Sequence, residues 1–252
     1  MNQNLQPAHL ISLFLFACAA ACSPPAAEQG ALLSEGRIRT AVFDPAGSTA
    51  YLVQLAEGGA VWIDVGIESD GVLLKETMAD SDIAEEDLRG IFMTHGHGDH
   101  ITGALAFPDV PVYAMAAEAP LIAGEEAPER PFPSGGPEPT GINVSEPLDG
   151  DATVQLAGTT IEAYAIPGHT DGSAAYIVHG VLFLGDAASR TDDGDIQGAT
   201  WLFSKDADAS EASLRALGEK LADREDIHTL AFGHSAALED GLPVFLQWLG
   251  VD

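Results

Sequence analysis

Cysteine is absent from almost all of this sequence. The 252-residue chain contains two cysteines, Cys18 and Cys22, and both lie within the first 22 residues. The remainder of the chain therefore has no disulfide, no thiolate metal ligand and no cysteine nucleophile. We expect its chemistry to use histidine, aspartate and bound metal.

Positive charge is also scarce. Lysine and arginine together number 10, against 39 aspartates and glutamates, and the formal net charge is −29. A nucleic acid would meet a repulsive field, and no basic patch is present to release its counterions. This excludes a nuclease and favours a small-molecule substrate. Hydrophobic residues make up 46% of the chain, which is enough for a substantial core. The sequence leaves the oligomeric state open.

The sequence lacks a hydrophobic run long enough to span a bilayer. The run from Leu10 to Ala21 is too short, and it resembles a bacterial lipoprotein signal with Cys22 as the lipidated first mature residue. Cys18 is a second candidate for lipidation, and simple secretion after cleavage near Ala21 is the alternative. Each reading predicts an exported protein of the periplasm or cell envelope, with membrane contact only through the lipid. We predict a signal segment at 1–22, a flexible tether at 23–36 and one domain at 37–252.

One stretch contains an unusual concentration of metal-binding side chains. It follows a short apolar run, Ile91-Phe92-Met93, which is typical of a buried strand, and it reads Thr94-His95-Gly96-His97-Gly98-Asp99-His100. The neutral imidazole of histidine is the commonest side-chain ligand of metal ions in proteins. The intervening glycines remove bulk and allow a tight backbone path. The stretch therefore predicts a metal centre at the end of a strand.

Further polar side chains follow other predicted strands. Each stands directly after an apolar run, at the point where a loop begins: Asp64, His169, Asp186 and His234. We expect these strand ends to converge on the histidine cluster.

The remaining pattern predicts alternating strands and helices around a mixed sheet. We expect strands at Arg37–Phe43, Tyr51–Leu55, Ala60–Ile63, Gly90–Met93, Val112–Ala114, Thr153–Leu156, Thr160–Ala165, Ala174–Val178, Val181–Leu184 and Thr229–Phe232. We expect helices at about Gly71–Ala79, Glu85–Arg89 and Pro243–Leu249. Another is expected to start inside the 94–100 stretch and run through Ile101–Leu105, and one contains Leu214, Leu217 and Leu221 with a capping box at Asp208 and Glu211. Residues 124–141 are predicted to form an irregular loop.

Together these residues resemble the metallo-β-lactamase fold superfamily, from Arg37 to the end of the chain. The resemblance implies an α/β (α+β) fold, a four-layer αββα sandwich of two mixed β-sheets flanked by helices, with the site at one edge. It also implies that two metal ions are bound. One would be held by His95, His97 and His169; the second by Asp99, His100 and His234; and Asp186 would bridge them. Asp64 would orient a ligand from behind.

The ligand set contains nitrogen and oxygen but no sulfur, which suits two Zn²⁺ ions and tolerates iron or manganese. The expected function is hydrolysis of an ester, thioester, lactone or related carbonyl compound by hydroxide held between the two ions. The resemblance assigns catalytic roles to Asp99, Asp186 and His234. Aspartate at position 186 is more similar to the thioesterase and lactonase branches than to the β-lactamases. The scarcity of positive charge favours a neutral or weakly charged substrate over a glutathione thioester.

Three alternatives stay open at this point. The histidine stretch is also similar to that of persulfide dioxygenases, in which a single iron would use His95, His169 and Asp186. The chain could instead be a β-lactamase, or a metal-binding lipoprotein without catalytic activity. Lys205 is a hypothetical ligand for a substrate carboxylate. Metal content separates the redox reading from the hydrolytic one.

Overall fold

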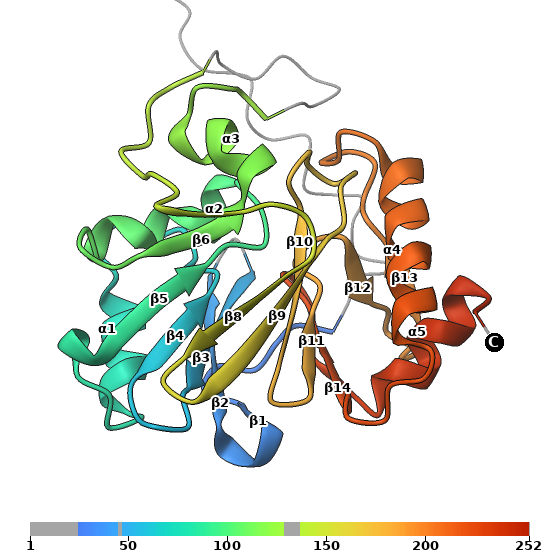
Figure 1. The fold of residues 1–252 in the computed structure, drawn as a ribbon, viewed down its shortest axis with the longest axis horizontal. Coiled ribbons are helices and arrows are strands. Elements are labelled where there is room, and N and C mark those ends of the chain that lie inside the picture. Colours follow the sequence, from blue (N-terminus) through green and yellow to red (C-terminus); the bar gives the residue numbers. More distant parts are fainter. Residues whose placement is uncertain (1–24, 45–46, 129–136, 252) are drawn as a thin grey trace, which may run out of the picture.

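The computed structural model describes residues 25–44, 47–128 and 137–251. The predicted signal segment, including Cys18 and Cys22, lies outside these residues. Two large sheets pack face to face, with α1 (Val72–Ala79) outside the first and α4 (Ala207–Leu221) and α5 (Gly241–Leu249) outside the second (Figure 1). This four-layer αββα sandwich confirms the predicted fold class. No helix among the described residues is both long and apolar enough to cross a bilayer.

The first sheet has seven strands in the order β1-β2-β3-β4-β5-β6-β7. Neighbours are antiparallel from β1 to β4 and parallel from β4 to β7. The strands are β1 (Leu32–Leu33), β2 (Ile38–Phe43), β3 (Ser48–Gln54), β4 (Ala60–Ile63), β5 (Leu88–Phe92), β6 (Val112–Met115) and β7 (Glu146–Leu148).

The second sheet has six strands in the order β15-β14-β11-β10-β9-β8. Only the β11–β14 pair is parallel. The strands are β8 (Ala152–Leu156), β9 (Thr159–Ala165), β10 (Ala174–Val178), β11 (Val181–Phe183), β14 (Thr229–Ala231) and β15 (Leu238–Glu239). A small separate sheet pairs β12 (Ala188–Arg190) with β13 (Ile196–Gly198).

Three apolar clusters fill the spaces between the four layers. One, with Trp62 and Leu74, joins the first sheet to α1; a second, with Val53 and Tyr176, lies between the sheets; the third, with Leu214, joins the second sheet to α4 and α5. The central strands are therefore buried on both faces, which explains why they read as nearly continuous apolar runs rather than alternating ones. The two remaining helices, α2 (Gly98–Ile101) and α3 (Ala119–Ala123), are short.

The segment expected to be a tether makes ordered contacts from Pro25 onward. The carbonyl of Pro25 accepts a hydrogen bond from Ala236 N at 2.7 Å, Gly30 N donates to Thr40 O at 3.1 Å, and β1 pairs with β2. These residues add an edge strand to the first sheet, so the ordered domain begins before Arg37.

Two local predictions were wrong. Glu85–Arg89 is not an α-helix: a 3₁₀ turn covers Glu85–Asp87, and β5 begins at Leu88 because this buried residue pairs with β4. The cap of α4 is Asp206 rather than Asp208. The side chain of Asp206 accepts a hydrogen bond from Ala209 N at 2.9 Å, so the cap lies two residues before the predicted one and the helix begins at Ala207.

Candidate metal centre

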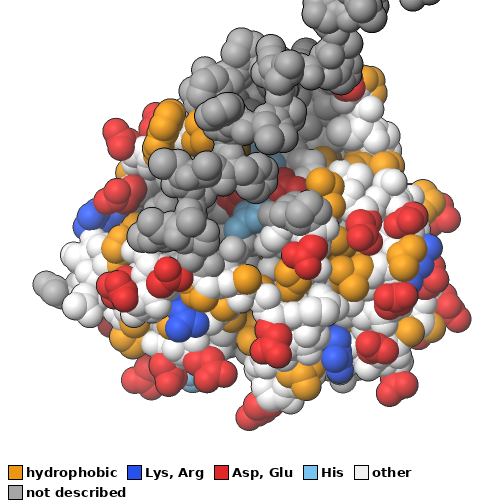
Figure 2. All heavy atoms as spheres, turned by 180° about the vertical axis from the view of Figure 1, so that it is seen from behind, with side chains coloured by type: hydrophobic (Ala, Val, Ile, Leu, Met, Phe, Trp, Pro, Cys, Tyr) orange, Lys and Arg blue, Asp and Glu red, His pale blue; other side chains and the backbone are white. Residues whose placement is uncertain are grey.

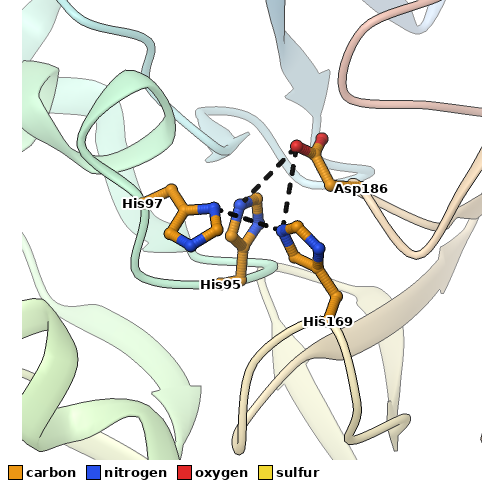
Figure 3. A group of neighbouring side chains, drawn as sticks. All are labelled: His95, His97, His169 and Asp186. Carbon is orange, nitrogen blue, oxygen red and sulfur yellow. Dashed lines mark hydrogen bonds and ion pairs between the residues drawn. The ribbon is translucent and has the colours of Figure 1, made fainter. Parts of the chain in front are cut away.

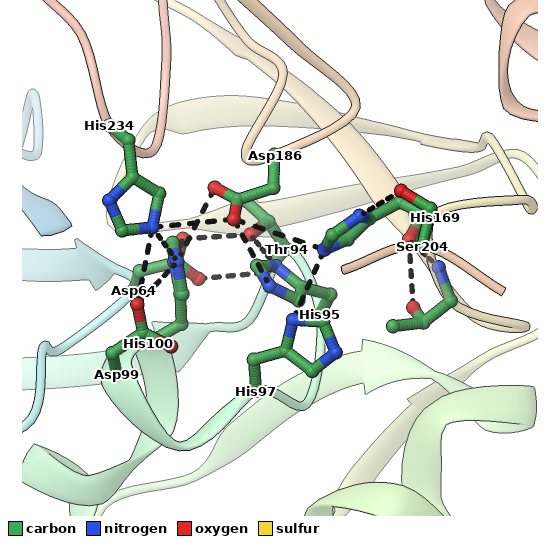
Figure 4. A network of polar contacts seen from close by, with 12 residues as sticks. Asp64, Thr94, His95, His97, Asp99, His100, His169, Asp186, Ser204 and His234 are labelled. Carbon is green, nitrogen blue, oxygen red and sulfur yellow. Dashed lines mark hydrogen bonds and ion pairs between the residues drawn. The ribbon is translucent and has the colours of Figure 1, made fainter. Parts of the chain in front are cut away.

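All of the side chains predicted from the sequence to form the site converge at one edge of the two sheets (Figure 4). The first sheet contributes the loops after β4 and β5, which carry Asp64 and the 94–100 stretch. Because β4 and β5 are parallel neighbours, their carboxyl ends meet at the same edge. The second sheet contributes the loops after β9, β11 and β14, which carry His169, Asp186 and His234. Face-to-face packing of the sheets brings these two groups together.

The first donor set consists of His95, His97, His169 and Asp186 (Figure 3). One ligand atom from each lies within 4.8 Å of those of the others. His97 Nδ1 is 3.2 Å from His169 Nε2, and Asp186 Oδ2 is 3.9 Å from both His95 Nε2 and His169 Nε2. The three imidazoles are buried, and one nitrogen of each faces the other donors of the set.

The second donor set consists of Asp99, His100 and His234. His234 Nε2 is 3.2 Å from both Asp99 Oδ2 and His100 Nε2. Asp186 also reaches this set: its Oδ1 is 3.4 Å from His100 Nε2, and its Oδ2 is 3.3 Å from His234 Nε2. Asp186 therefore stands between the two sets, which is the arrangement that the sequence resemblance predicts for a bridging ligand.

Asp64 supports the centre from behind. Its Oδ1 accepts a hydrogen bond from Thr94 N at 2.8 Å, and its Oδ2 lies 2.7 Å from Thr94 Oγ1 and 2.9 Å from His100 Nδ1. Because an ionised carboxylate only accepts, Thr94 Oγ1 and His100 Nδ1 are both donors here. In neutral His100 the lone pair is then on Nε2, which faces Asp186 and His234. Burial disfavours the charged ring, but Asp186 and Asp64 raise the pKa of His100 well above its ordinary value. Metal binding at Nε2 therefore has to displace a proton.

The same reasoning assigns the tautomers of two further imidazoles. The hydroxyl of Thr94 donates to Asp64, so it accepts from His95 Nδ1 at 3.0 Å. Ser204 Oγ donates to Thr200 O at 2.8 Å, so it accepts from His169 Nδ1, also at 3.0 Å. In both histidines the inward-facing Nε2 keeps its lone pair. Outer hydrogen bonds of this kind are the usual means of orienting histidine ligands of metals.

A family model for the metallo-beta-lactamase superfamily matches residues 43–234, the segment that contains every residue of both donor sets. This chain belongs to the metallo-beta-lactamase superfamily. Within it, the sequence is 32% identical over 140 residues to a probable metallo-hydrolase, YybB, of Bacillus subtilis (strain 168). That match covers 52% of this chain and 59% of YybB.

Two further similarities agree with this assignment. A hydroxyacylglutathione hydrolase of Edwardsiella ictaluri is 30% identical over 102 residues, covering 39% of this chain and 32% of that enzyme. The chain thus spans only part of the length of these curated relatives. A solved metallo-beta-lactamase family protein from Thermus thermophilus matches with a TM-score of 0.61 at 20% identity, covering 85% of this chain and 78% of that one. This last likeness concerns the fold alone.

The protonation of the first donor set suits a metallo-beta-lactamase centre. Burial lowers the pKa of His95 well below its ordinary value, that of His97 to about 3, and that of His169 to a lesser extent. These imidazoles are therefore neutral at physiological pH, as metal coordination requires.

The carboxylates of the centre remain charged. Burial opposes ionisation of Asp186, but His100 and His234 hold its pKa well below the ordinary value. Burial likewise opposes ionisation of Asp99, yet its hydrogen bond with His234 brings its pKa to about 2.

The donor sets fit divalent metal ions. His95 Nε2 is buried, carries a lone pair and has no hydrogen-bond partner among the described residues. An unsatisfied buried acceptor is costly, and coordination to a cation removes that cost. The two sets offer nitrogen and oxygen donors in the proportions that zinc and related divalent ions bind.

A cleft of about 880 Å³ opens beside the centre. His97, Asp99, His169, Asp186 and His234 line it on one side. On the face shown in Figure 2, histidine is visible with acidic side chains beside it. A second cleft, of about 420 Å³, is also lined by His97 and His169. Pro128 and Pro137, the described residues nearest to segment 129–136 of the 124–141 loop, line it as well.

The structure brings together all of the predicted donors and places Asp64 behind them, but the sequence did not indicate the other residues that orient the imidazoles. Thr94 and Ser204 adjoin recognised motifs, and their hydroxyls were the only available signal. Glu118, which contacts two of the ligand-bearing loops, carries no signal in the sequence because it lies in an ordinary alanine-rich stretch after β6.

Proposed function

We propose that this protein is a zinc-dependent hydrolase of esters, thioesters or lactones that binds two metal ions. The observation that supports this most directly is the sharing of Asp186 between two donor sets at the floor of a cleft. Zinc ions bound there would supply Lewis acidity, polarising a carbonyl and lowering the pKa of water to about 7. We assign His95, His97 and His169 to one ion, Asp99, His100 and His234 to the other, and Asp186 to both.

The protein's own residues have distinct parts in this proposal. Asp64, Thr94 and Ser204 hold a proton on the outward Nδ1 of His100, His95 and His169 through the hydrogen bonds described above, so the inward Nε2 of each ring is the atom offered to a metal ion. Asp99 and His234 are the more exposed donors, with side chains 29% and 32% exposed, and both line the larger cleft. We therefore assign them to the substrate side of the centre.

The walls of the clefts favour a neutral substrate with an apolar substituent. Ile67 and Phe203 line the larger cleft and are 44% and 46% exposed, so each offers apolar surface to a ligand. Glu125, Glu126 and Asp171 line the smaller cleft, and Lys205 beside them is ion-paired with Asp171 at 2.7 Å. A substrate with several carboxylates, such as a glutathione thioester, would be repelled there.

The test combines elemental analysis of the purified protein with a hydrolysis panel containing a neutral aryl ester, a lactone, a glutathione thioester and a β-lactam. We expect about two zinc ions per chain and hydrolysis of the ester or lactone that is lost on chelation and restored by Zn²⁺. One iron per chain without hydrolysis would instead support the redox alternative. A metal-loaded protein inert toward the whole panel would refute the enzymatic proposal. Preference for the glutathione thioester or the β-lactam would refute the substrate argument.

We also propose that the protein is exported and anchored to the cell envelope by a lipid on Cys22. The support is the N-terminal apolar run followed by small residues and cysteine. Labelling cells with a tagged fatty acid should mark the wild-type protein but not Cys22→Ala. If Cys22→Ala is still labelled but Cys18→Ala is not, the lipid is attached to Cys18 instead. An unlabelled wild-type protein would indicate simple secretion.

A further inference from the structure

One buried carboxylate joins two of the loops that carry metal donors. Glu118 follows β6 and is 1% exposed. Its Oε1 accepts a hydrogen bond from Gly96 N, and its Oε2 accepts one from Gly172 N, each at 2.6 Å. Gly96 stands between His95 and His97, and Gly172 lies three residues after His169. Glu118 thus connects the backbones that carry the three imidazoles of the first donor set.

The two glycines are needed for this close approach. A Cβ atom at position 96 would lie 2.9 Å from Leu121 Cγ and 3.1 Å from Glu118 Oε1. A Cβ atom at position 172 would lie 2.4 Å from Glu118 N and 2.6 Å from Glu118 Cβ. Neither glycine has a positive φ. They provide space rather than a special backbone conformation. Glu118 occupies the space at Gly172, and Glu118 together with Leu121 occupies it at Gly96.

The loop that carries His169 is also fixed from its other side. Lys205 N donates to His169 O, and Asp206 N donates to Gly168 O, both at 2.9 Å, just before α4 begins. These bonds join the loop to the residues that precede α4, the helix that packs outside the second sheet. This part of the chain is also connected to the first sheet. Ala174 N, at the start of β10, donates to Thr94 O at 2.8 Å, and Glu118 joins the loop itself to Gly96. Glu118 is the side chain that acts directly between the loop of His169 and the residue between His95 and His97.

We propose that Glu118 is a positioning residue that sets the separation of the two loops and so prepares the first donor set for its metal ion. This inference rests on the metal-dependent function proposed above. The two hydrogen bonds that join the Glu118 carboxylate to these loops come from backbone N–H groups, not from donor side chains. The second donor set has a different support, Asp64, so loss of Glu118 is expected to weaken one set and spare the other.

The test is metal titration of the metal-free Glu118→Gln variant. Glutamine keeps the volume but replaces one carboxylate oxygen with an NH₂ group, which would face a backbone N–H. Zn²⁺ affinity is measured by competition with a chelating indicator, in backgrounds that isolate each set. His234→Ala leaves the first set to be titrated, and His97→Ala leaves the second. We expect Glu118→Gln to bind Zn²⁺ about 10-fold more weakly at the first set and with unchanged affinity at the second set.

Two further variants keep the result interpretable. Glu162→Gln removes another hydrogen-bonded glutamate, one that pairs with Arg224 outside the site, and should leave both affinities unchanged. Gly172→Ala should reproduce the selective loss by displacing Glu118. Three results would each overturn the proposal. They are an equal loss of Zn²⁺ affinity at both sets, an unchanged affinity in Glu118→Gln, and failure of both the Glu118→Gln and the Gly172→Ala chains to fold.

The measured Zn²⁺ affinity does not depend on whether the protein hydrolyses a substrate. A wild-type protein that binds two zinc ions but hydrolyses nothing would refute the proposed function, while the comparison of affinities would still decide the role of Glu118. A wild-type protein that binds no metal would refute both.

Discussion

Replacement of Asp64 by asparagine tests the hydrogen bonds that support the second donor set. Asp64 accepts bonds from Thr94 N, Thr94 Oγ1 and His100 Nδ1 at 2.7–2.9 Å. Its backbone has φ +54°, a left-handed conformation that asparagine tolerates better than most residues. Asp64→Asn therefore removes the charge and one acceptor without adding backbone strain.

The expected magnitude follows from the number of acceptors that are lost. The amide oxygen of asparagine can keep the bond from Thr94 N, and its NH₂ group then faces His100 Nδ1. Because two donors cannot pair, His100 moves its proton to Nε2, the atom that should carry the lone pair for the metal. Loss of such support weakens metal binding about 10- to 100-fold. This corresponds to about 1.4–2.7 kcal/mol.

The assay is zinc titration of the metal-free protein, with thermal melting as a check on the fold. Asp82→Asn is the matched control, because Asp82 also has a positive φ, of +56°, but is exposed and belongs to neither donor set. We expect Asp64→Asn to lose more affinity at the second set than at the first, and Asp82→Asn to lose none. Wild-type affinity in Asp64→Asn would refute the assignment of the His100 tautomer.

Other predictions concern the bridge, the smaller cleft and the surface. Asp186→Ala should abolish turnover and lower the metal content below two ions per chain while the metal-free fold is retained; a wild-type rate would contradict the two-metal mechanism. Lys205→Ala should raise KM only for substrates that carry a carboxylate, and an unchanged KM for such a substrate would remove this role. Hydrogen bonds from Arg224 lower the pKa of Glu162, so its contribution to stability is present above the unfolded pKa and is lost as pH falls through the folded one. Urea unfolding should therefore show Glu162→Gln about 1 kcal/mol less stable at pH 7, with the difference shrinking at acidic pH; a constant difference would refute the pairing.

Local patterns in the sequence predicted much of the fold. The central strands of both sheets were recognisable because burial on two faces demands continuous apolar runs, and α4 was recognisable from the spacing of Leu214, Leu217 and Leu221. The short strands β1, β7 and β15 at the sheet edges were not predicted. Element boundaries were less predictable. The start of β5 depends on pairing with β4, and the start of α4 depends on which of several acidic side chains reaches a free backbone N–H.

The sequence by itself determined which side chains to expect as donors, and the structure brings them together. Histidines and aspartates at the ends of apolar strands are a local feature, and they are sufficient to indicate a metal centre of this family. Only the tertiary structure decided which nitrogen of each imidazole faces inward and what fixes the loops. Glu118 illustrates the reason, because its two partners lie 22 and 54 residues away along the chain. A buried carboxylate acquires its role from neighbours that only the packing of two sheets brings within hydrogen-bonding distance.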